Sequence, residues 1–142
     1  MTQIDNAERK TLILTGASRV ITCSRHPFPE DCPWEAGPED HIQVDLADPG
    51  NTQAAIAEMH ERLKDQGSRL NALVNNAAIS PKGEGGSRLG VFDTDLATWY
   101  RVFQVNFFAP VTLARGLVQE LKAAQGSVVN VTSIAGERVH PF

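Results

Sequence analysis

Small residues, most of them polar, stand at the end of three short apolar runs of the chain. Asn75 and Asn76 close the run LNALVNN, Ser133 closes VVNVTS, and Gly16 follows TLILT. Amide and hydroxyl groups of this kind hydrogen-bond to a ligand or to its reacting oxygen. Runs of this length and apolar character are typical of buried parallel strands, whose carboxyl ends meet at one edge of a sheet. We therefore expect a polar binding site along such an edge.

The turn after the first run contains the small residues of a phosphate-binding turn. Gly16 to Arg19 read GASR, which is the kind of turn that opens a helix and cradles a phosphate in a dinucleotide-binding fold. An ordinary tight turn is the alternative. The helix itself is missing, because Val20 already begins a second strand-like run, VITCS. Since adjacent parallel strands need a connection of roughly a dozen residues or more, this turn permits only a hairpin or a path outside the sheet.

Composition bounds the classes of function. The chain has 142 residues and a net charge of -4 with acids and bases interspersed, which indicates one domain and argues against a nucleic-acid-binding patch. No stretch has the length and apolarity of a membrane span, and the amino end lacks a signal-peptide pattern, so we expect a soluble, cytoplasmic protein. Cys23 and Cys32 are then expected to be free thiols, and their spacing indicates no metal site.

The other elements must bring the polar groups together. Asp48 and Pro49 have the types expected at the cap and first position of a helix, Thr94 or Asp95 is placed to cap a second helix, and Pro110 should kink that second helix. The pattern predicts a proline-rich loop over residues 26–40, a strand over 41–44, a helix over 48–66, a strand over 70–78, a Gly- and Pro-rich loop over 79–90, a long helix from Thr94 to Gln125, and a last strand over 128–131.

Five segments together resemble the amino-terminal part of the short-chain dehydrogenase/reductase family. They are TLILTGASR, HIQVDLAD, LNALVNNAAIS, WYRVFQVNFFAP and GSVVNVTSIAG, and they span nearly the whole chain. The resemblance implies an α/β fold with a Rossmann-like, three-layer parallel sheet, here truncated, forming a single incomplete NAD(P)-binding domain over residues 1–142. It also implies an oxidoreductase that uses NADP or NAD to move a hydride to or from a small carbonyl or alcohol substrate.

The resemblance assigns roles to particular residues. Ser133 matches the family's catalytic serine, and Asn106 matches the asparagine of its catalytic tetrad. Arg19 and Arg25 stand where members that prefer NADP carry a base that meets the extra phosphate, which favours NADP over NAD here. The residues that match cofactor-binding positions are Gly16, Ser18, Arg19, Arg25, Asp45, Leu46, Asn76, Ala77 and Ala78.

Each assignment has a structural alternative. The arginines could be solvated surface residues, and Asp45 could cap a turn instead of contacting adenine. Asn75 and Asn76 could satisfy backbone groups at the end of a strand while also lining the cofactor side. Asn106 could be a structural amide at the helix kink or could bind a water molecule in the site. Ser133 by itself would be an ordinary loop serine.

The chain also departs from the family pattern. The second and third glycines of TGxxxGxG are missing, Ala78 replaces the glycine of NNAG, no tyrosine follows Tyr100, and no lysine follows Lys122, so the YxxxK pair has no counterpart. We expect weak cofactor binding and little turnover by these 142 residues. The alternative function is a non-catalytic interaction module or gene fragment derived from such an enzyme, which assembles into homo-oligomers through the helix from Thr94 to Gln125.

Overall fold

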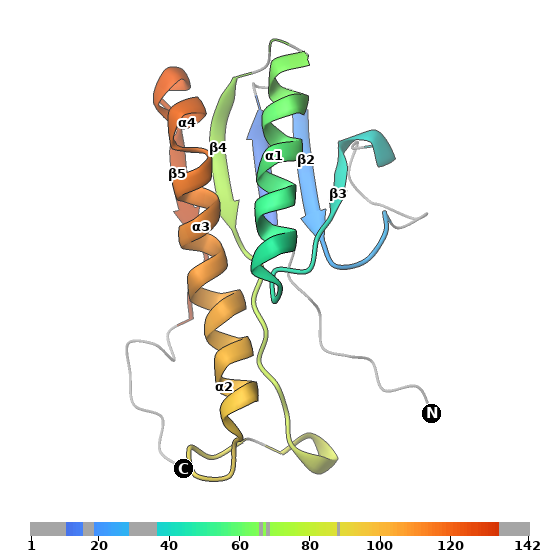
Figure 1. The fold of residues 1–142 in the computed structure, drawn as a ribbon, viewed down its shortest axis with the longest axis vertical. Helices are drawn as coiled ribbons and strands as arrows, with labels where there is room; N and C mark the ends of the chain where they lie inside the picture. Colours follow the sequence, from blue (N-terminus) through green and yellow to red (C-terminus); the bar gives the residue numbers. More distant parts are fainter. Residues whose placement is uncertain are drawn as a thin grey trace.

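The computed structural model describes residues 11–15, 19–28, 37–65, 67, 69–87 and 89–133. Figure 1 shows a sheet with helices packed along it. The elements are β1 (Thr11–Thr15), β2 (Arg19–Ser24), β3 (His41–Gln43), α1 (Pro49–Asp65), β4 (Leu70–Asn75), α2 (Leu96–Phe103), the π-helical turn η3 (Gln104–Phe108), α3 (Ala109–Gly116), α4 (Val118–Ala124) and β5 (Ser127–Asn130), with short 3-10 turns at Pro38–Asp40 and Glu84–Gly86.

The described strands form one sheet in the order β3-β2-β1-β4-β5. The pairs β2–β3 and β4–β5 are parallel, whereas β1 is antiparallel to both β2 and β4. Four strands therefore point one way and β1 points the other. The α/β, Rossmann-like class is confirmed, but the expectation of an entirely parallel sheet is wrong at β1. The reason is the short connection between β1 and β2, which closes a hairpin, as its length allowed.

The reversal of β1 changes which strand ends meet. Thr15, the last residue of β1, pairs with Leu70, the first residue of β4. The chain therefore leaves β1 at the edge of the sheet opposite to the carboxyl ends of β4 and β5. The expectation that three strands deliver polar groups to one edge holds for β4 and β5 and fails for β1.

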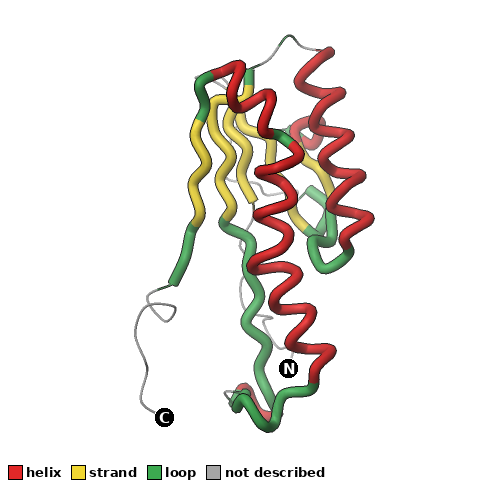
Figure 2. Tube along the Cα trace, turned by 60° about the vertical axis from the view of Figure 1, so that its left-hand side comes forward, coloured by secondary structure: helices red, strands yellow, loops and turns green. Residues whose placement is uncertain are grey.

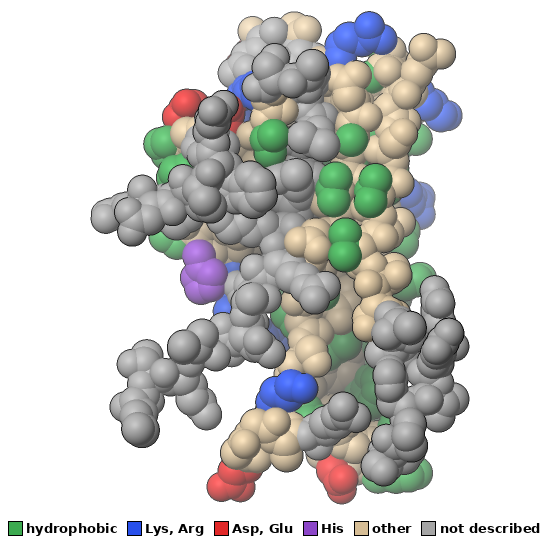
Figure 3. Space-filling view, turned by 180° about the vertical axis from the view of Figure 1, so that it is seen from behind, with side chains coloured by type: hydrophobic (Ala, Val, Ile, Leu, Met, Phe, Trp, Pro, Cys, Tyr) green, Lys and Arg blue, Asp and Glu red, His purple; other side chains and the backbone are tan. Residues whose placement is uncertain are grey.

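The described helices cover one face of the sheet. Figure 2 shows the helices beside the strands, on one side of them, and Figure 3, seen from behind, shows hydrophobic side chains on the opposite face. The crossovers β3–α1–β4 and β4–α2–β5 run in the same direction across the sheet, and right-handed crossovers of one direction lie on one face. The described part thus has two layers, where the family resemblance implied three.

Helix α1 and the helices α3 and α4 enclose the core against the sheet. Asp48 caps α1, accepting hydrogen bonds from the backbone nitrogens of Gly50 (2.6 Å) and Asn51 (3.0 Å), as predicted. Gly116 of α3 lies so close to α1 that a Cβ atom there would be 2.7 Å from Cδ1 of Ile56. The buried hydrophobic residues of this core include Ile21, Ile42, Ile56, Met59, Leu70, Leu73, Leu113 and Leu117. The packing of these helices on the sheet holds the strands, and with them the residues that follow the strands, in place.

The predicted long helix exists, but in segments. It begins at the Asp95 cap, whose carboxylate accepts a hydrogen bond from the Thr98 nitrogen at 2.6 Å, and it ends before Gln125, which has a left-handed backbone (φ 53°). The predicted disturbance near Pro110 is the wide turn η3, which Figure 1 shows between α2 and α3 as part of one long rod. Pro110 has no N–H to bond the carbonyl of Asn106, so the helix can widen there at little cost.

Candidate functional site

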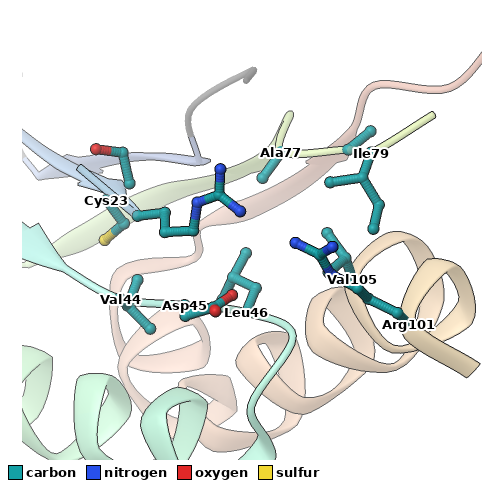
Figure 4. A pocket seen from close by; sticks show the side chains of 11 residues that line it. Cys23, Val44, Asp45, Leu46, Ala77, Ile79, Arg101 and Val105 are labelled. Carbon is teal, nitrogen blue, oxygen red and sulfur yellow. The ribbon is translucent and has the colours of Figure 1, made fainter. Parts of the chain in front are cut away.

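The residues that follow the carboxyl ends of β2, β3 and β4 line one pocket, which we call the β2–β4 pocket. Figure 4 shows it from close by. Its cavity volume is about 40 Å³, and its lining residues are Cys23, Ser24, Arg25, Val44, Asp45, Leu46, Ala77, Ala78, Ile79, Arg101 and Val105. Five residues predicted to bind a cofactor are among them, namely Arg25, Asp45, Leu46, Ala77 and Ala78. The pocket thus has apolar walls, two guanidinium groups and one carboxylate.

Strand β3 holds the loop that carries Arg25. The Gln43 side chain donates a hydrogen bond to the Arg25 carbonyl at 3.0 Å, and His41 Nε2 donates to the His26 carbonyl at 2.9 Å. His41 is buried, and its Nδ1 lies 2.8 Å from the Thr22 hydroxyl. Since Nε2 donates in this arrangement, Nδ1 accepts from Thr22 in the neutral ring. The backbone of Arg25 is therefore anchored to two residues of the neighbouring strand.

Asp45 both stabilises a turn and lines the pocket. Its Oδ1 accepts a hydrogen bond from the Ala47 nitrogen at 2.9 Å, and its backbone carbonyl accepts from the Asp48 nitrogen at 3.1 Å. The second carboxylate oxygen is not used in these bonds. The two roles that the sequence left open for Asp45 are therefore compatible.

A second, wider cavity of about 500 Å³ adjoins the first, and we call it the β5 groove. Ser133 and Asn106, the two predicted catalytic residues, both line it. Ala77 and Ala78 line both cavities, so the groove continues the β2–β4 pocket along the sheet edge. The remaining lining residues are Asn75, Phe107, Pro110, Val111, Ala114, Val128, Asn130, Val131 and Thr132.

Asn106 fastens the wide turn η3 to the loop after β4. Its Oδ1 accepts a hydrogen bond from the Ile79 nitrogen, and its Nδ2 donates to the Ile79 carbonyl, both at 2.9 Å. These bonds match the structural alternative for this residue. Nδ2 carries a second N–H, which is not used in them and could bind a water molecule.

The two strand-end asparagines differ in their surroundings. Asn75 is 5 % exposed, and its Nδ2 donates to Asn130 Oδ1 of β5 at 2.9 Å, so it ties β4 to β5. Asn76 is half-buried and lines neither the β2–β4 pocket nor the β5 groove. Asn76 therefore lies next to Ala77 in the chain without lining either cavity, and its predicted contact with the cofactor stays a prediction.

Arg19 lies away from the site. It is the first residue of β2 and pairs with Thr15, at the sheet edge opposite to Arg25. Its guanidinium forms an ion pair with Asp40, with Nε 2.9 Å from Oδ1. The structure does not bring Arg19 and Arg25 together, because the hairpin places the amino end of β2 beside the end of β1. Gly16 and Ser18 lie outside the described residues.

Sequence reasoning missed the other six residues that line the β2–β4 pocket, namely Cys23, Ser24, Val44, Ile79, Arg101 and Val105. Arg101 and Val105 are one helical turn apart, so they share a face, and Val105 adjoins the predicted Asn106. Burial raises the pKa of the Cys23 thiol to about 12, which the positive charge of Arg62 offsets only in part. The thiol is therefore protonated at neutral pH and is a poor nucleophile.

The described residues form neither a metal centre nor a membrane-spanning helix. No group of three or more His, Cys, Asp or Glu residues there is arranged to hold a metal ion. No described helix combines the length and apolarity needed to cross a membrane.

Comparison with known proteins identifies the family. The family model for short chain dehydrogenases matches residues 7–142. The chain belongs to the short chain dehydrogenase family. It is 50% identical to the protein FixR of Bradyrhizobium diazoefficiens over 157 aligned positions, covering 99% of this chain and 56% of FixR. The aligned region is longer than the 142 residues of this chain, so FixR carries residues within it that are absent here.

Solved structures of short chain dehydrogenases agree with this assignment. An oxidoreductase of the family from Brucella ovis, in complex with a partially ordered NAD, is 67% identical with a TM-score of 0.79, over 84% of this chain and 54% of that one. A metagenomic short-chain oxidoreductase in complex with NADP is 26% identical with a TM-score of 0.56, over 69% of this chain and 41% of that one. The chain thus spans about half the length of FixR and of the oxidoreductase from Brucella ovis.

Proposed function

We propose that the chain binds the adenosine end of a nicotinamide cofactor in the β2–β4 pocket, as part of an oxidoreductase that acts on a small carbonyl or alcohol. One observation carries this proposal: five residues assigned to the cofactor by family resemblance, from three separate segments of the chain, line a single pocket. The relatives from Brucella ovis and from the metagenome, whose structures hold NAD and NADP, support the choice of ligand.

The lining of the pocket suits an adenosine. The apolar side chains of Leu46, Ala77 and Ile79 can pack against the faces of the base, because their contribution is area removed from water. The Asp45 carboxylate can accept a hydrogen bond from an amino or hydroxyl group. The Arg25 guanidinium can pair with a phosphate on the ribose, so NADP is the favoured cofactor.

The β5 groove is then the place of the reacting carbon. The bound nicotinamide supplies or accepts the hydride. The Ser133 hydroxyl, placed in the groove with Asn106, would donate a hydrogen bond to the substrate oxygen and so orient it. Asn106 would act mainly by holding Ile79, which lines the adjoining pocket.

Two features limit what these 142 residues do by themselves. Thr15, the last residue of β1, lies at the sheet edge opposite to the site, whereas a phosphate-binding turn would have to follow a strand that ends at the site. Tyr100, the single tyrosine of the sequence, is 71 % exposed on α2 and lines neither cavity. We therefore propose weak cofactor binding and little turnover by the chain alone, as expected from its missing glycines and YxxxK pair.

Filling the pocket tests this proposal. Ala78 is exposed and lines both cavities, so Ala78→Leu adds bulk at the site without disturbing the core. The matched control is Ala123→Leu, an equal change at an exposed position of α4. Titration of the full chain with NADPH and NADH, followed by nucleotide fluorescence, should show binding by the original chain and by Ala123→Leu, and a loss of about tenfold or more for Ala78→Leu. Equal binding by all three proteins would place the nucleotide elsewhere.

The exposed face of the long helix supports a second candidate function, self-association. Leu96, Tyr100, Phe103, Phe107 and Val111 are between 42 and 71 % exposed and follow one another at helical spacing. An apolar stripe of this kind marks a protein-binding surface more often than a solvent-facing one. We propose that two copies of the chain associate through it.

The molar mass of the full chain, measured by light scattering as it elutes from a size-exclusion column, tests the association. Phe103→Asp should lower the measured mass to that of the monomer, because it places a charge in the middle of the stripe. Gln119→Asp, an exposed change on α4, is the control and should leave the mass unchanged. A monomeric original chain at high micromolar concentration would refute the association.

A further inference from the structure

Helices α3 and α4 border an open groove on the side that faces away from α1, and we call it the α4 groove. Gly116 packs against Ile56 of α1, whereas Val118, which lies about 200° further round the helix axis, lines the groove. Strand β5 contributes Val128 and lies on this side of α3 and α4 in Figure 1. The cavity volume is about 800 Å³, and the lining residues are Ala114, Arg115, Val118, Leu121, Lys122, Gln125, Gly126 and Val128.

The groove is a gap in the layer of helices that covers the sheet. Helix α4 packs on β4, the neighbour of β5, but Val128 of β5 lines the groove and is 42 % exposed. Leu121, which is buried, and Val118, which is half-buried, supply further apolar surface from α4. Apolar residues on the covered face of a sheet are normally buried by a helix of the same layer. A further helix beside α3 and α4 would therefore bury Val128 and Val118 together.

Two positive charges stand along the groove. Arg115 and Lys122 are exposed and seven residues apart, so they project from the same face of the helices, about 10 Å apart along the axis. No Asp or Glu lines the groove, and neither cationic side chain has a hydrogen bond or an ion pair within the described residues. Glu120, which lies between them in the sequence, pairs with His60 of α1 at 2.6 Å. Figure 3 shows Lys and Arg side chains near the edge of the molecule where α4 and β5 lie.

We propose that the α4 groove binds an acidic amphipathic helix of a partner protein. The apolar face of that helix would pack on Val118 and Val128, and Asp or Glu residues beside this face would pair with Arg115 and Lys122. Residues 114–125 extend about 16 Å along the helix axis, so the partner helix needs about three turns for this contact. Charge complementarity selects this partner, because a basic helix would be repelled and an uncharged helix would leave both cations without a counter-ion.

This interaction is separate from the functions proposed above. The α4 groove shares no residue with the β2–β4 pocket or with the exposed apolar stripe of the long helix. It adjoins the β5 groove, because Ala114 and Val128 line both. The partner helix would therefore lie at one end of the β5 groove, and its binding does not depend on a bound cofactor.

Two synthetic peptides test the charge preference. Each has about four helical turns with leucines along one face, and the positions beside that face are all Glu in one peptide and all Lys in the other. Fluorescence anisotropy of the labelled peptides, titrated with the full chain, should show the Glu peptide binding about tenfold or more tightly than the Lys peptide. The double variant Arg115→Glu/Lys122→Glu should reverse this preference. Added salt should weaken binding of the Glu peptide, because screening weakens the charged contacts.

The matched control is the double variant Lys64→Glu/Lys82→Glu. Both lysines are exposed and lie outside the α4 groove, and the change of net charge is the same. This variant should bind the Glu peptide within about twofold of the original chain. An equal loss in the two double variants would show a general effect of net charge and overturn the proposal.

The place of binding and the identity of the occupant are measured separately. The NMR amide signals of Gly126 and Val128 should shift when the Glu peptide binds, whereas a shift confined to other residues would overturn the proposal. Equal binding of the two peptides, or binding of neither, would overturn it too. If the original chain is a dimer that Arg115→Glu/Lys122→Glu separates and Phe103→Asp does not, the groove holds a second copy, and the partner helix is refuted.

Discussion

Removing the Asn106 side chain should loosen the wall shared by the β2–β4 pocket and the β5 groove. The amide makes two hydrogen bonds of 2.9 Å to the backbone of Ile79, and Asn106→Ala removes both. A neutral hydrogen bond contributes about 0.5–1.5 kcal/mol to stability. Because Asn106 is exposed, water replaces part of what is lost, so the expected loss is near the lower end, about 1 kcal/mol in total.

Two measurements on the full chain check this value. A loss of about 1 kcal/mol should lower the midpoint of urea unfolding by about 0.5 M. Hydrogen exchange reports on the hydrogen bond itself, so the Ile79 N–H should exchange faster in Asn106→Ala than in the original chain. The exchange rates of amides in α1 should rise only by the amount that the lower global stability explains. Gln119→Ala, a similar truncation at an exposed position of α4, should leave the Ile79 rate unchanged.

A third variant separates the two hydrogen bonds. Asn106→Asp keeps an oxygen that accepts from the Ile79 N–H, but it replaces the donor to the Ile79 carbonyl with a second oxygen. The N–H should therefore remain protected although the protein is less stable. If the Ile79 N–H exchanges at the same rate in the original chain and in Asn106→Ala, the loop after β4 is held by other contacts, and the structural role given to Asn106 is refuted.

Three further predictions concern packing and titration. Gly116→Val should destabilise the chain by about 1–3 kcal/mol, because its side chain would meet Ile56, and Ile56→Ala should restore part of the loss in a thermal melt. The Cys23 thiol, whose pKa burial raises to about 12, should resist iodoacetamide at pH 8 until urea unfolds the chain, and rapid labelling of the native protein would contradict its burial. Because the pKa of this thiol is higher in the folded than in the unfolded chain, the free energy of unfolding should fall as the pH rises from about 9 toward 12. Hydrogen bonds from the Thr98 nitrogen and hydroxyl lower the pKa of Asp95. The Asp95 cap should therefore stabilise α2 above about pH 4 and lose this effect as the pH falls through the lowered pKa. The helical circular dichroism signal of Asp95→Ala should match that of the original chain at low pH and be weaker at pH 7.

The sequence by itself determined the elements whose causes are local. The caps Asp48 and Asp95, the stop before Gly126 and the disturbance near Pro110 depend on side chains within a few residues of the backbone they act on, and all of them are found in the structure. The family was readable too, because its motifs are short and contiguous. Ser133 and Asn106 line one groove, because Ser133 comes shortly after β5 and Asn106 lies within the long helical rod, both of which the pattern predicted.

Only the tertiary structure decided which arginines belong to the pocket. A three-residue connection allows a hairpin, but the choice of β4 as the second antiparallel neighbour of β1 depends on residues more than fifty positions away. That pairing moves Arg19 to the far edge and leaves Arg25 at the near one. Arg101 enters from a helix that packs there only once the sheet has formed. The direction of each strand and the identity of its neighbours in the sheet depend on how the whole sheet is buried. A short stretch of sequence does not contain that information.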